Sequence, residues 1–304
     1  MIGSVSRPGR RLVSALLAGL LAVGTVPARP ALRDPPPAAQ ALQARYLALA
    51  DRLRAGPFDV ALQLHSVESA DTVRGDLHAV LEHPFPRLAE LAERPANWCD
   101  VLILHINVKF CRAVPGAEGT ALRVGLGRKT AQAPEEAEVL LFDYRVVAAG
   151  PDFLEIRLDA GDGPMGTRDH RIVLQAMPLD AGRAFMRLSY AFSYGLAGRL
   201  AMKGYLATVG RDKVGFTPAG RDADGRARYV GGTRGLVERN AMRYFLAVDA
   251  YLDAAAQPPS RRPQARLEAW YDATERYPRQ LHEMSRGEYL AMKREEYARQ
   301  QNPR

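Results

Sequence analysis

Apolar and polar residues alternate through the middle of the chain, which is the pattern of antiparallel β-strands with one buried face. In 73–81, for example, Val73, Leu77 and Leu81 occupy positions that share one face of a strand. The segments between the strands are rich in glycine and proline, which favour turns. The predicted strands are 58–68, 73–81, 105–114, 121–130, 137–149, 153–159, 168–177 and 183–194.

Apolar residues recur at helical spacing on both sides of this strand-rich region. The segment 38–54 carries a stripe of leucines, and 196–208 is a second candidate helix. The strongest prediction is a long helix over 233–255, whose apolar face includes Val237 and Tyr244. A strand pair, short helices, a run of strands and a long helix, in that order, predict an α+β fold.

The last part of the chain differs in composition from the rest. It follows Pro258 and Pro259, and its segment 266–297 combines many charges with aromatic residues at helical intervals. We expect one or two helices that pack on the main domain. The alternative is an amphipathic helix at a membrane surface, but the charges are mixed in sign rather than dominantly basic.

The chain begins with the three parts of a secretory signal peptide. Arg7, Arg10 and Arg11 form a positive segment, 12–26 is an apolar run, and small residues up to Ala28 suit cleavage. The apolar run is shorter than the roughly 20 residues of a membrane-spanning helix, so a cleaved signal is favoured over an uncleaved anchor. We therefore expect a periplasmic or secreted protein whose signal peptide, 1–28, is removed near Ala28.

Removal of 1–28 leaves 304 − 28 = 276 residues and lowers the net charge from +8 to +5, because three arginines are lost. The remaining basic residues are dispersed, which suits loose contact with anionic lipid head groups but not a nucleic-acid interface. No later segment has a transmembrane pattern. No Gly-x-Ser-x-Gly, Walker-type or dinucleotide-binding motif occurs, and nothing in the sequence indicates a cofactor or an oligomeric state.

Two cysteines, Cys99 and Cys111, are 12 residues apart. If the whole interval were a strand, they would lie about 40 Å apart and could not bond. If a helix ends near residue 104 and 105–114 is a returning strand, the sulfurs can meet. In an oxidising compartment a disulfide is favoured, and two buried free thiols are the alternative.

The segment 73–85 reads Val-Arg-Gly-Asp-Leu-His-Ala-Val-Leu-Glu-His-Pro-Phe, a strand that runs into a proline break. Leu88, Leu91 and the turn Pro95-Ala96-Asn97-Trp98 follow it. With these features the chain resembles the START-like (helix-grip, SRPBCC-type) superfamily over roughly 58–255. The resemblance implies a curved antiparallel sheet of about seven strands that grips a long C-terminal helix. A cavity for a hydrophobic or amphipathic small molecule is then expected between sheet and helix.

This interpretation divides the chain into four parts. The signal peptide, 1–28, is followed by a linker and N-terminal helix over 29–57. The START-like domain spans 58–256 and contains an insertion at 196–232. A charged helical extension, 257–304, completes the chain.

Two sets of strand residues are candidates for the cavity lining, because alternate residues share a face. For His105, Asn107 and Lys109 the alternative is a solvent-facing strand surface. For Tyr190, Phe192 and Tyr194 the alternative is ordinary core packing. The long helix would supply a third set. These candidates are His105, Asn107 and Lys109, then Tyr190, Phe192 and Tyr194, and finally Tyr244, Phe245 and Val248.

The beginning of the long helix is a candidate anion site. Gly232, Thr233 and Arg234 lie there, and Arg211 and Lys213 precede them. Free amides at a helix N-terminus and nearby basic side chains could hold an anion such as a lipid phosphate. The alternative is a flexible glycine segment with Thr233 as the N-cap.

The six histidines lack zinc-ligand spacing with one another or with cysteine, so no metal site is expected. The favoured function is an exported binding or transfer protein for a lipid or other hydrophobic small molecule. One alternative is a cyclase- or hydrolase-type enzyme that uses the same cavity, which a cluster of titratable groups in the pocket would favour. The other is an envelope interaction protein that binds no ligand. The sequence favours a binding protein over an enzyme.

Overall fold

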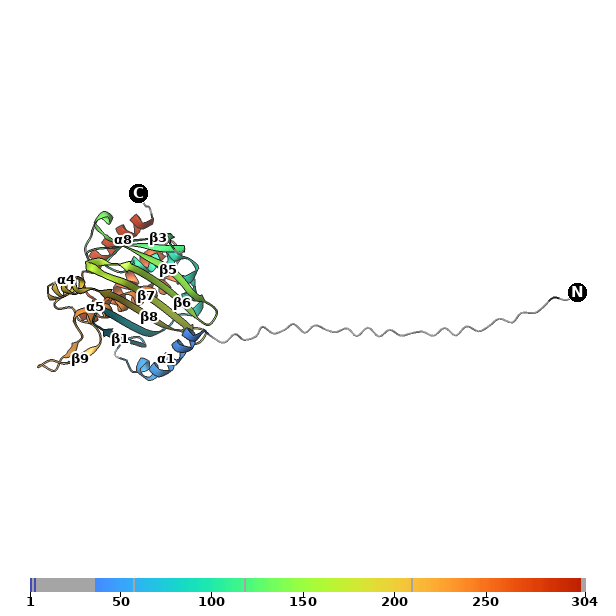
Figure 1. Cartoon of the computed structure of the whole chain (residues 1–304), viewed down its shortest axis with the longest axis horizontal. Coiled ribbons are helices and arrows are strands. Elements are labelled where there is room, and N and C mark those ends of the chain that lie inside the picture. The colour runs from blue at the N-terminus through green and yellow to red at the C-terminus, as the bar shows by residue number, and fades with distance from the viewer. Residues whose placement is uncertain (2, 4–35, 57, 118, 209, 302–304) are drawn as a thin grey trace. The chain divides into compact units, whose positions relative to one another are not determined.

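The computed structural model describes residues 1, 3, 36–56, 58–117, 119–208 and 210–301. The chain divides into two units, Met1–Pro35 and Pro36–Arg304, and the second is the folded unit described below (Figure 1). The predicted signal peptide 1–28 and its cleavage near Ala28 fall, apart from Met1 and Gly3, outside the described residues. Export of the protein therefore stays a prediction.

The folded unit is α+β, as predicted. Its strands are β1 (Leu62–Glu68), β2 (Thr72–Leu81), β3 (Val108–Gly116), β4 (Gly119–Leu126), β5 (Glu138–Ala149), β6 (Leu154–Asp162), β7 (Thr167–Pro178), β8 (Ala184–Tyr194), β9 (Pro218–Arg221) and β10 (Ala227–Tyr229). Its α-helices are α1 (Pro37–Arg54), α2 (Phe85–Glu93), α3 (Pro95–Leu102), α4 (Leu196–Ala207), α5 (Gly232–Asp253), α6 (Arg262–Glu275), α7 (Pro278–Leu281) and α8 (Arg286–Gln301). Short 3-10 turns, η1 (Pro134–Glu136), η2 (Pro164–Gly166) and η3 (Ala254–Ala256), complete the elements.

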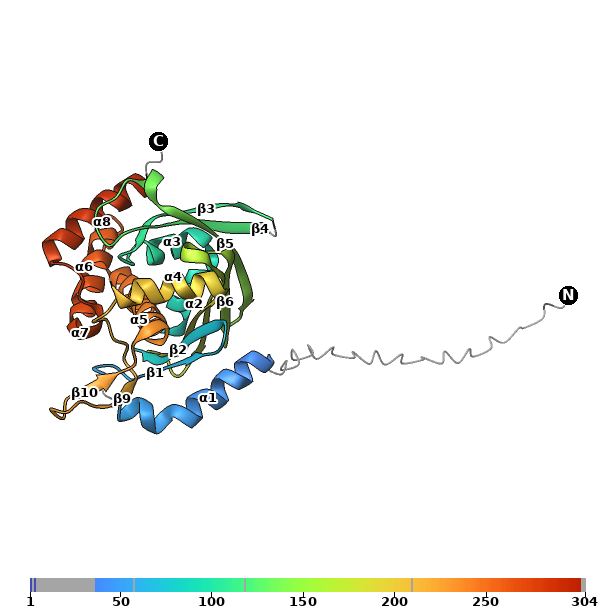
Figure 2. The same ribbon diagram turned by 60° about the vertical axis from the view of Figure 1, so that its left-hand side comes forward.

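The main sheet has eight antiparallel strands in the order β1-β2-β8-β7-β6-β5-β4-β3, one more than the approximate seven expected. β2 pairs with β8, the last strand of this sheet along the chain, with Leu77 opposite Leu188. The helices α2 and α3 carry the chain from β2 to the far edge at β3. The sheet curves around α5, while α6 packs on the side of α5 away from the sheet and α8 lies along the edge strand β3 (Figure 2). This is a helix-grip arrangement, so the fold class is confirmed.

The alternation in the sequence corresponds to the two faces of this sheet. Residues such as Leu77 and Leu188 point into the main core, which α5 also enters. The opposite face carries a polar ladder, in which Arg187 binds Asp76 at 2.6 Å and Gln175 at 3.1 Å. Helix α1 lies on this outer face and forms a second, smaller core with residues such as Phe185.

Cys99 in α3 and Cys111 in β3 form a disulfide. The helix followed by a returning strand brings the two sulfurs together, as the length argument required. One detail of that prediction was wrong, because 103–107 forms turns and β3 begins only at Val108.

The tail packs on the main sheet and on α5. Trp270 of α6 donates from Nε1 to the carbonyl of Arg243 in α5 at 3.1 Å. Helix α8 covers the edge strand β3, where Gln300 accepts a hydrogen bond from the backbone of Cys111 at 2.8 Å. Exposed strand edges invite pairing with other chains, so this cover protects the sheet.

A buried charge triad fixes α8 to β3. Glu296 accepts from Lys109 at 3.0 Å and from Lys293 at 2.7 Å, and all three side chains are fully buried. Lys293 also donates to the carbonyls of His105 and Val108. The carboxylate and the backbone acceptors together compensate the burial of two ammonium groups.

A second buried carboxylate fixes the insertion to the beginning of α5. Glu238 is fully buried and accepts hydrogen bonds from Ser66, from the amides of Phe216 and Thr217, and from the Thr217 hydroxyl. These bonds satisfy both carboxylate oxygens. Within the described residues, no helix has the length and apolar character needed to cross a bilayer.

Candidate functional site

A row of aromatic rings on β8 faces α5. Tyr190, Phe192 and Tyr194 alternate along the strand, with ring centroids 5.9 Å apart for the first pair and 6.0 Å for the second. Alternate residues of a strand share a face, so the row follows directly from the sequence spacing. It leads from the end of β8 toward the middle of α5.

The middle of α5 meets the inner end of this row. Tyr244 packs edge-on against Tyr190, with centroids 5.6 Å apart, and lies one helical turn after Asn240. The ring of His105 lies 5.0 Å from that of Tyr244. Side chains from a turn, a strand and a helix thus converge at one point inside an otherwise apolar core.

His105 presents a hydrogen-bond donor to this cluster. Its Nδ1 accepts from the amide of Asn107 at 3.2 Å, so Nε2 carries the proton in the neutral ring. Burial, together with the charges of Arg243 and Lys293, holds the pKa of His105 well below its usual value. Nε2 has no partner within 3.5 Å among the described residues, although Asn240 lies near enough to affect the pKa by hydrogen bonding. A buried N–H without an acceptor can donate a hydrogen bond to an oxygen of a ligand.

His170 approaches the cluster from β7. A register irregularity between Arg168 and Arg171, with Asp169 at a positive φ of 51°, allows His170 to point inward. The Thr167 hydroxyl donates to the carbonyl of Pro164 at 2.6 Å and lies 2.8 Å from His170 Nε2. The single hydroxyl proton is thereby used, so Nε2 must be the donor and Nδ1 the acceptor.

Tyr190 lies between His170 and the part of the cluster that contains His105. Its hydroxyl lies 3.4 Å from the acceptor Nδ1 of His170, and Asn240 lies near enough to affect the pKa of Tyr190 by hydrogen bonding. Burial lowers the pKa of His170 to about 4 and raises the pKa values of Tyr190 and Tyr244. All of these groups are neutral near pH 7, so the site offers neutral donors and acceptors rather than a charge.

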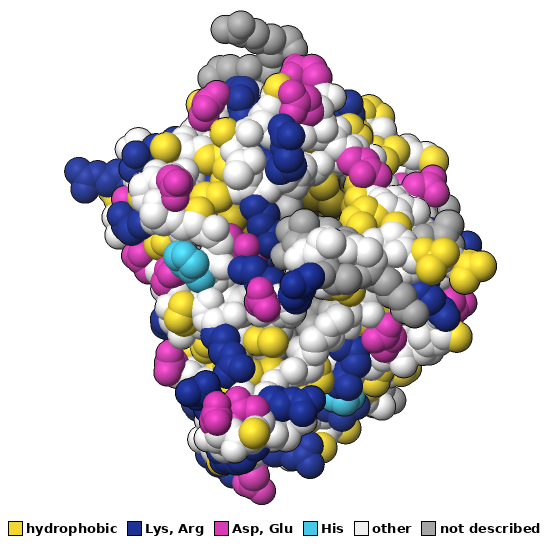
Figure 3. All heavy atoms as spheres, turned by 90° about the vertical axis from the view of Figure 1, so that its left-hand side faces the viewer, with side chains coloured by type: hydrophobic (Ala, Val, Ile, Leu, Met, Phe, Trp, Pro, Cys, Tyr) yellow, Lys and Arg dark blue, Asp and Glu magenta, His cyan; other side chains and the backbone are white. Residues whose placement is uncertain are grey.

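An opening lies at the outer end of the aromatic row, beside α4. A cavity of about 240 Å³ is lined by Tyr194, by Met202 and Leu206 of α4, and by Glu68 and Thr233. Figure 3 views the molecule from the side on which α4 lies, where hydrophobic side chains line a hollow in the surface. Tyr194 donates to Glu68 at 2.9 Å, and so does Thr233 at 2.6 Å, which fixes the rim of the opening.

A larger cavity of about 600 Å³ lies on the outer face of the sheet, beneath α1. Leu42 and Leu49 of α1 line one side, and Arg187, Asp76 and His78 line the other. It is amphipathic, but Arg187 and Asp76 are already paired with each other. This cavity and the aromatic row lie on opposite faces of the sheet.

The structure brings five of the nine predicted lining residues together. His105, Tyr190, Phe192, Tyr194 and Tyr244 meet as described above. Phe245 and Val248 of α5 are buried in the same core, but among the described residues Phe245 makes no ring contact with this cluster.

Asn107 and Lys109 do not join the cluster. The prediction that they share a strand face with His105 was wrong, because β3 begins after Asn107. Asn107 instead donates to the carbonyl of Gly127 at 2.7 Å, and Lys109 binds Glu296 of α8.

The predicted anion residues are distributed among separate contacts. Lys213 pairs with Glu283 at 3.1 Å, and Arg234 donates to Ser66 at 3.0 Å. Gly232 has a positive φ of 60° and opens α5 without a side-chain cap, while Thr233 lies inside the first turn and is not the N-cap. Arg211 is exposed in the preceding turn. These residues do not converge on a single point.

Sequence reasoning missed two members of the cluster, Asn240 and His170. Asn240 interrupts the apolar face of α5 one turn before Tyr244, and a polar residue at such a position is a usable signal. His170 was missed because the bulge that turns it inward has no evident mark in the sequence. A third group, His83 with Asp249 and Asp253, was missed because its members lie far apart in the sequence.

No family profile matches the sequence, and no curated protein is significantly similar to it. Among solved structures, the chain is similar to Ara h 8.0201, with 11% identity, coverage of 63% of this chain and 99% of that chain, and a TM-score of 0.36. It is also similar to a START superfamily protein from Mycobacterium smegmatis, with 9% identity, 47% and 93% coverage, and a TM-score of 0.31. A third similar structure is truncated norcoclaurine synthase from Thalictrum flavum. It has 13% identity, coverage of 48% of this chain and 90% of that chain, and a TM-score of 0.32. These scores are low, so the helix-grip assignment rests on the sheet order and on the position of α5.

Proposed function

We propose that this protein binds a hydrophobic small molecule that carries a polar oxygen, in the space between the sheet and α5. The observation that carries this proposal is the convergence of His105, Asn240, Tyr190 and Tyr244 within an apolar core. Such a small set of polar groups in an apolar site orients a ligand without binding an ion. Apolar burial, worth roughly 25 cal/mol per Å² removed from water, supplies most of the affinity.

The ligand enters beside α4 in this proposal. The packed rings of Tyr194, Phe192 and Tyr190 form a row that runs from the opening to the polar cluster. On the outer side of α4, Leu196 and Leu200 are 75% and 63% exposed at helical spacing. Exposed leucines next to an opening suit peripheral contact with a membrane from which a lipid is taken. The predicted signal peptide would place this activity in the periplasm or outside the cell.

The test of binding starts from the mature chain, purified under native conditions and extracted with organic solvent for mass spectrometry. A stoichiometric lipid or other hydrophobic molecule is the expected result. The recovered molecule is then titrated into a lipid-free preparation of the native protein and of the Asn240→Leu variant, and the variant should bind more weakly. An extract without such a molecule, together with no binding of fatty acids or phospholipids, would overturn the proposal.

An enzyme that uses the same site is the second candidate. The specific observation in its favour is the neutral His170, whose acceptor Nδ1 faces the Tyr190 hydroxyl at 3.4 Å. A neutral imidazole next to a phenol can exchange a proton with a bound substrate. Conversion of the recovered ligand by the native protein but not by His170→Gln would favour the enzyme. Unchanged ligand after prolonged incubation would favour the binding protein.

A further inference from the structure

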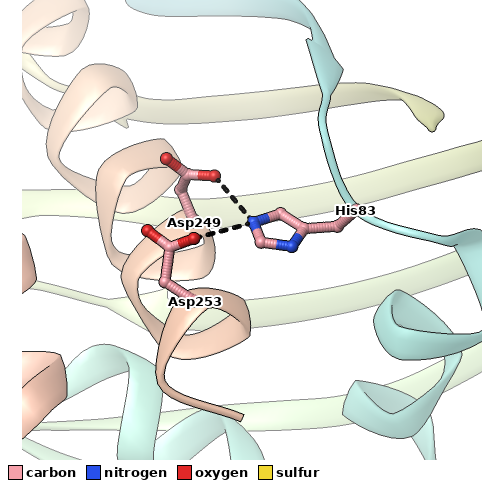
Figure 4. Close-up of side chains that lie close together, drawn as sticks. All are labelled: His83, Asp249 and Asp253. Carbon is pink, nitrogen blue, oxygen red and sulfur yellow. Dashed lines mark ion pairs between the residues drawn. The ribbon is translucent and has the colours of Figure 1, made fainter. Parts of the chain in front are cut away.

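Three metal-ligating side chains meet at the end of α5 that lies away from the opening. His83 follows β2, while Asp249 and Asp253 are one turn apart near the C-terminus of α5 (Figure 4). His83 Nε2 lies 3.3 Å from an oxygen of each carboxylate. The three donor atoms all lie within 4.8 Å of one another.

The geometry fits a shared cation better than a pair of hydrogen bonds. If His83 shared one N–H between the two carboxylates, both contacts would be long, because 3.3 Å exceeds the roughly 2.7–2.9 Å of a charge-assisted hydrogen bond. Metal–ligand bonds of about 2.1 Å place two donors about 3.3 Å apart when the angle at the metal is about 105°. A small rotation of Asp253, whose side chain is 58% exposed, would bring all three donors to one ion.

The electrostatic setting points to a cation independently of these distances. Two carboxylates one turn apart repel each other, and the C-terminal end of a helix carries partial negative charge, which adds to the cost. Among the described residues, neither Asp249 nor Asp253 forms an ion pair with lysine or arginine.

We propose that His83, Asp249 and Asp253 form a binding site for a divalent transition-metal ion of the zinc type. The imidazole nitrogen disfavours Mg²⁺ and Ca²⁺, which prefer oxygen ligands only, and the absence of sulfur from this set disfavours soft ions such as Cu⁺. Pro84, with φ fixed at −59°, holds the backbone next to His83 in place. The ion joins the end of β2 to the last turn of α5.

Three protein ligands leave at least one coordination position for water or a small anion. Asp253 is exposed, so this position opens to solvent. The site is independent of the proposed ligand cluster, because Asp249 lies further along α5 than Asn240 and Tyr244 and is not among the residues of that cluster.

The test is calorimetric titration of ZnCl₂ into the chelator-treated native protein, with thermal unfolding as a second measurement. We expect one ion per chain and a higher melting temperature with zinc. Asp249→Asn and Asp253→Asn should each weaken zinc binding by at least about tenfold. Asp253 is largely exposed, so its variant should fold even if changes at His83 destabilise the protein. Co²⁺ substitution then reports the coordination number through its visible absorption.

His282 provides the matched control. Its Nδ1 lies 2.9 Å from a carboxylate oxygen of Glu275, which makes a second histidine–carboxylate pair without a second aspartate. His282→Gln should bind zinc as the native protein does. The proposal is overturned if no stoichiometric zinc binding occurs, if the two aspartate variants bind zinc normally, or if His282→Gln loses binding to the same extent.

Discussion

The rings of His105 and Tyr244 lie 5.0 Å apart, which brings the turn before β3 to the middle of α5. The disulfide between Cys99 and Cys111 holds the two sides of that turn. Lys293 of α8 binds the carbonyl of His105 from the other side at 3.1 Å. The disulfide and the buried ammonium group of Lys293 therefore hold His105 in place. An orienting group of a binding site needs such support.

The first prediction concerns the Tyr190 hydroxyl. Tyr190→Phe keeps the ring in the core but removes the group that links His170 and Asn240. A hydrogen bond of about 1.4 kcal/mol corresponds to about tenfold in affinity, so the recovered ligand should bind about tenfold more weakly. Calorimetric titration measures this change.

Tyr271→Phe is the matched control for this change. Its hydroxyl donates to the carbonyl of Met284 at 3.0 Å, between α6 and the loop before α8. The Tyr271→Phe variant should bind the recovered ligand with the affinity of the native protein. Equal losses in the two variants would mean that the effect of Tyr190→Phe arises from lower stability rather than from ligand contact.

The second prediction concerns the exposed side of α4. Leu196→Ser combined with Leu200→Ser removes two leucines that are largely exposed and contribute little to the core. Burial of a leucine in a membrane contributes roughly 1.5–3 kcal/mol, so binding to anionic vesicles should fall at least about tenfold. Co-sedimentation with vesicles measures it. Leu47 and Leu141 are also exposed, and their double serine variant should bind vesicles normally.

The fold was largely predictable from the sequence because it depends on local alternation. Leu77 and Leu188 face the core and Asp76 and Arg187 face outward, so the strands could be placed by period alone. The cluster was only partly predictable. Tyr190, Phe192 and Tyr194 follow from strand spacing, whereas the inward turn of His170 depends on a bulge.

Long-range contacts account for the remaining errors. Lys109 has the pattern of a lining residue, but Glu296, which binds it, is 187 residues away and no local rule connects them. The same holds for His83 and Asp249. Metal-ligand spacing applies to neighbours in the sequence, and here the sheet and the long helix bring distant residues together.

The third prediction concerns the buried triad. Glu296→Gln leaves Lys109 and Lys293 fully buried without their carboxylate, so the free energy of unfolding at pH 7 should fall by about 3–5 kcal/mol. Burial already lowers the pKa of Lys293 to about 8, and loss of Glu296 should lower it further. The defect should therefore shrink between pH 7 and pH 9, as urea denaturation at both values would measure.

Glu295→Gln is the control, because Glu295 pairs with Arg299 at the surface with 66% of its side chain exposed. Such pairs contribute little, so its free energy of unfolding should change by less than about 1 kcal/mol. If Glu296→Gln were as mild as this control, the triad would not be the anchor of α8.

The fourth prediction concerns the disulfide. A bond that closes a loop of this length lowers the entropy of the unfolded chain and stabilises the fold by about 3 kcal/mol. The Cys99→Ser and Cys111→Ser double variant should lose about this amount in urea denaturation. A reductant should reproduce the loss in the native protein and have no effect on the variant. A native protein with two free thiols by alkylation would contradict the bond itself.

The fifth prediction concerns acid stability and His78. Burial lowers the pKa of His78 to about 4, and the charges of Arg187 and Arg45 act in the same direction while Asp76 opposes them. Below pH 6.5 the unfolded chain binds a proton at this position, but the folded protein does not until about pH 4. The contribution of His78 to the free energy of unfolding is therefore constant above pH 6.5. It falls as the pH decreases from 6.5 to 4, by up to about 3 kcal/mol.

His78→Gln removes this term, so its free energy of unfolding should depend less steeply on pH than that of the native protein between pH 6 and pH 4.5. Urea denaturation across that range measures the slope, which is about 1.4 kcal/mol per pH unit for one proton. His65 lies exposed on the neighbouring strand β1, and His65→Gln is the control. An unchanged slope in His78→Gln would mean that the folded protein accepts a proton on His78 as readily as the unfolded chain does, against the burial of that ring between α1 and the sheet.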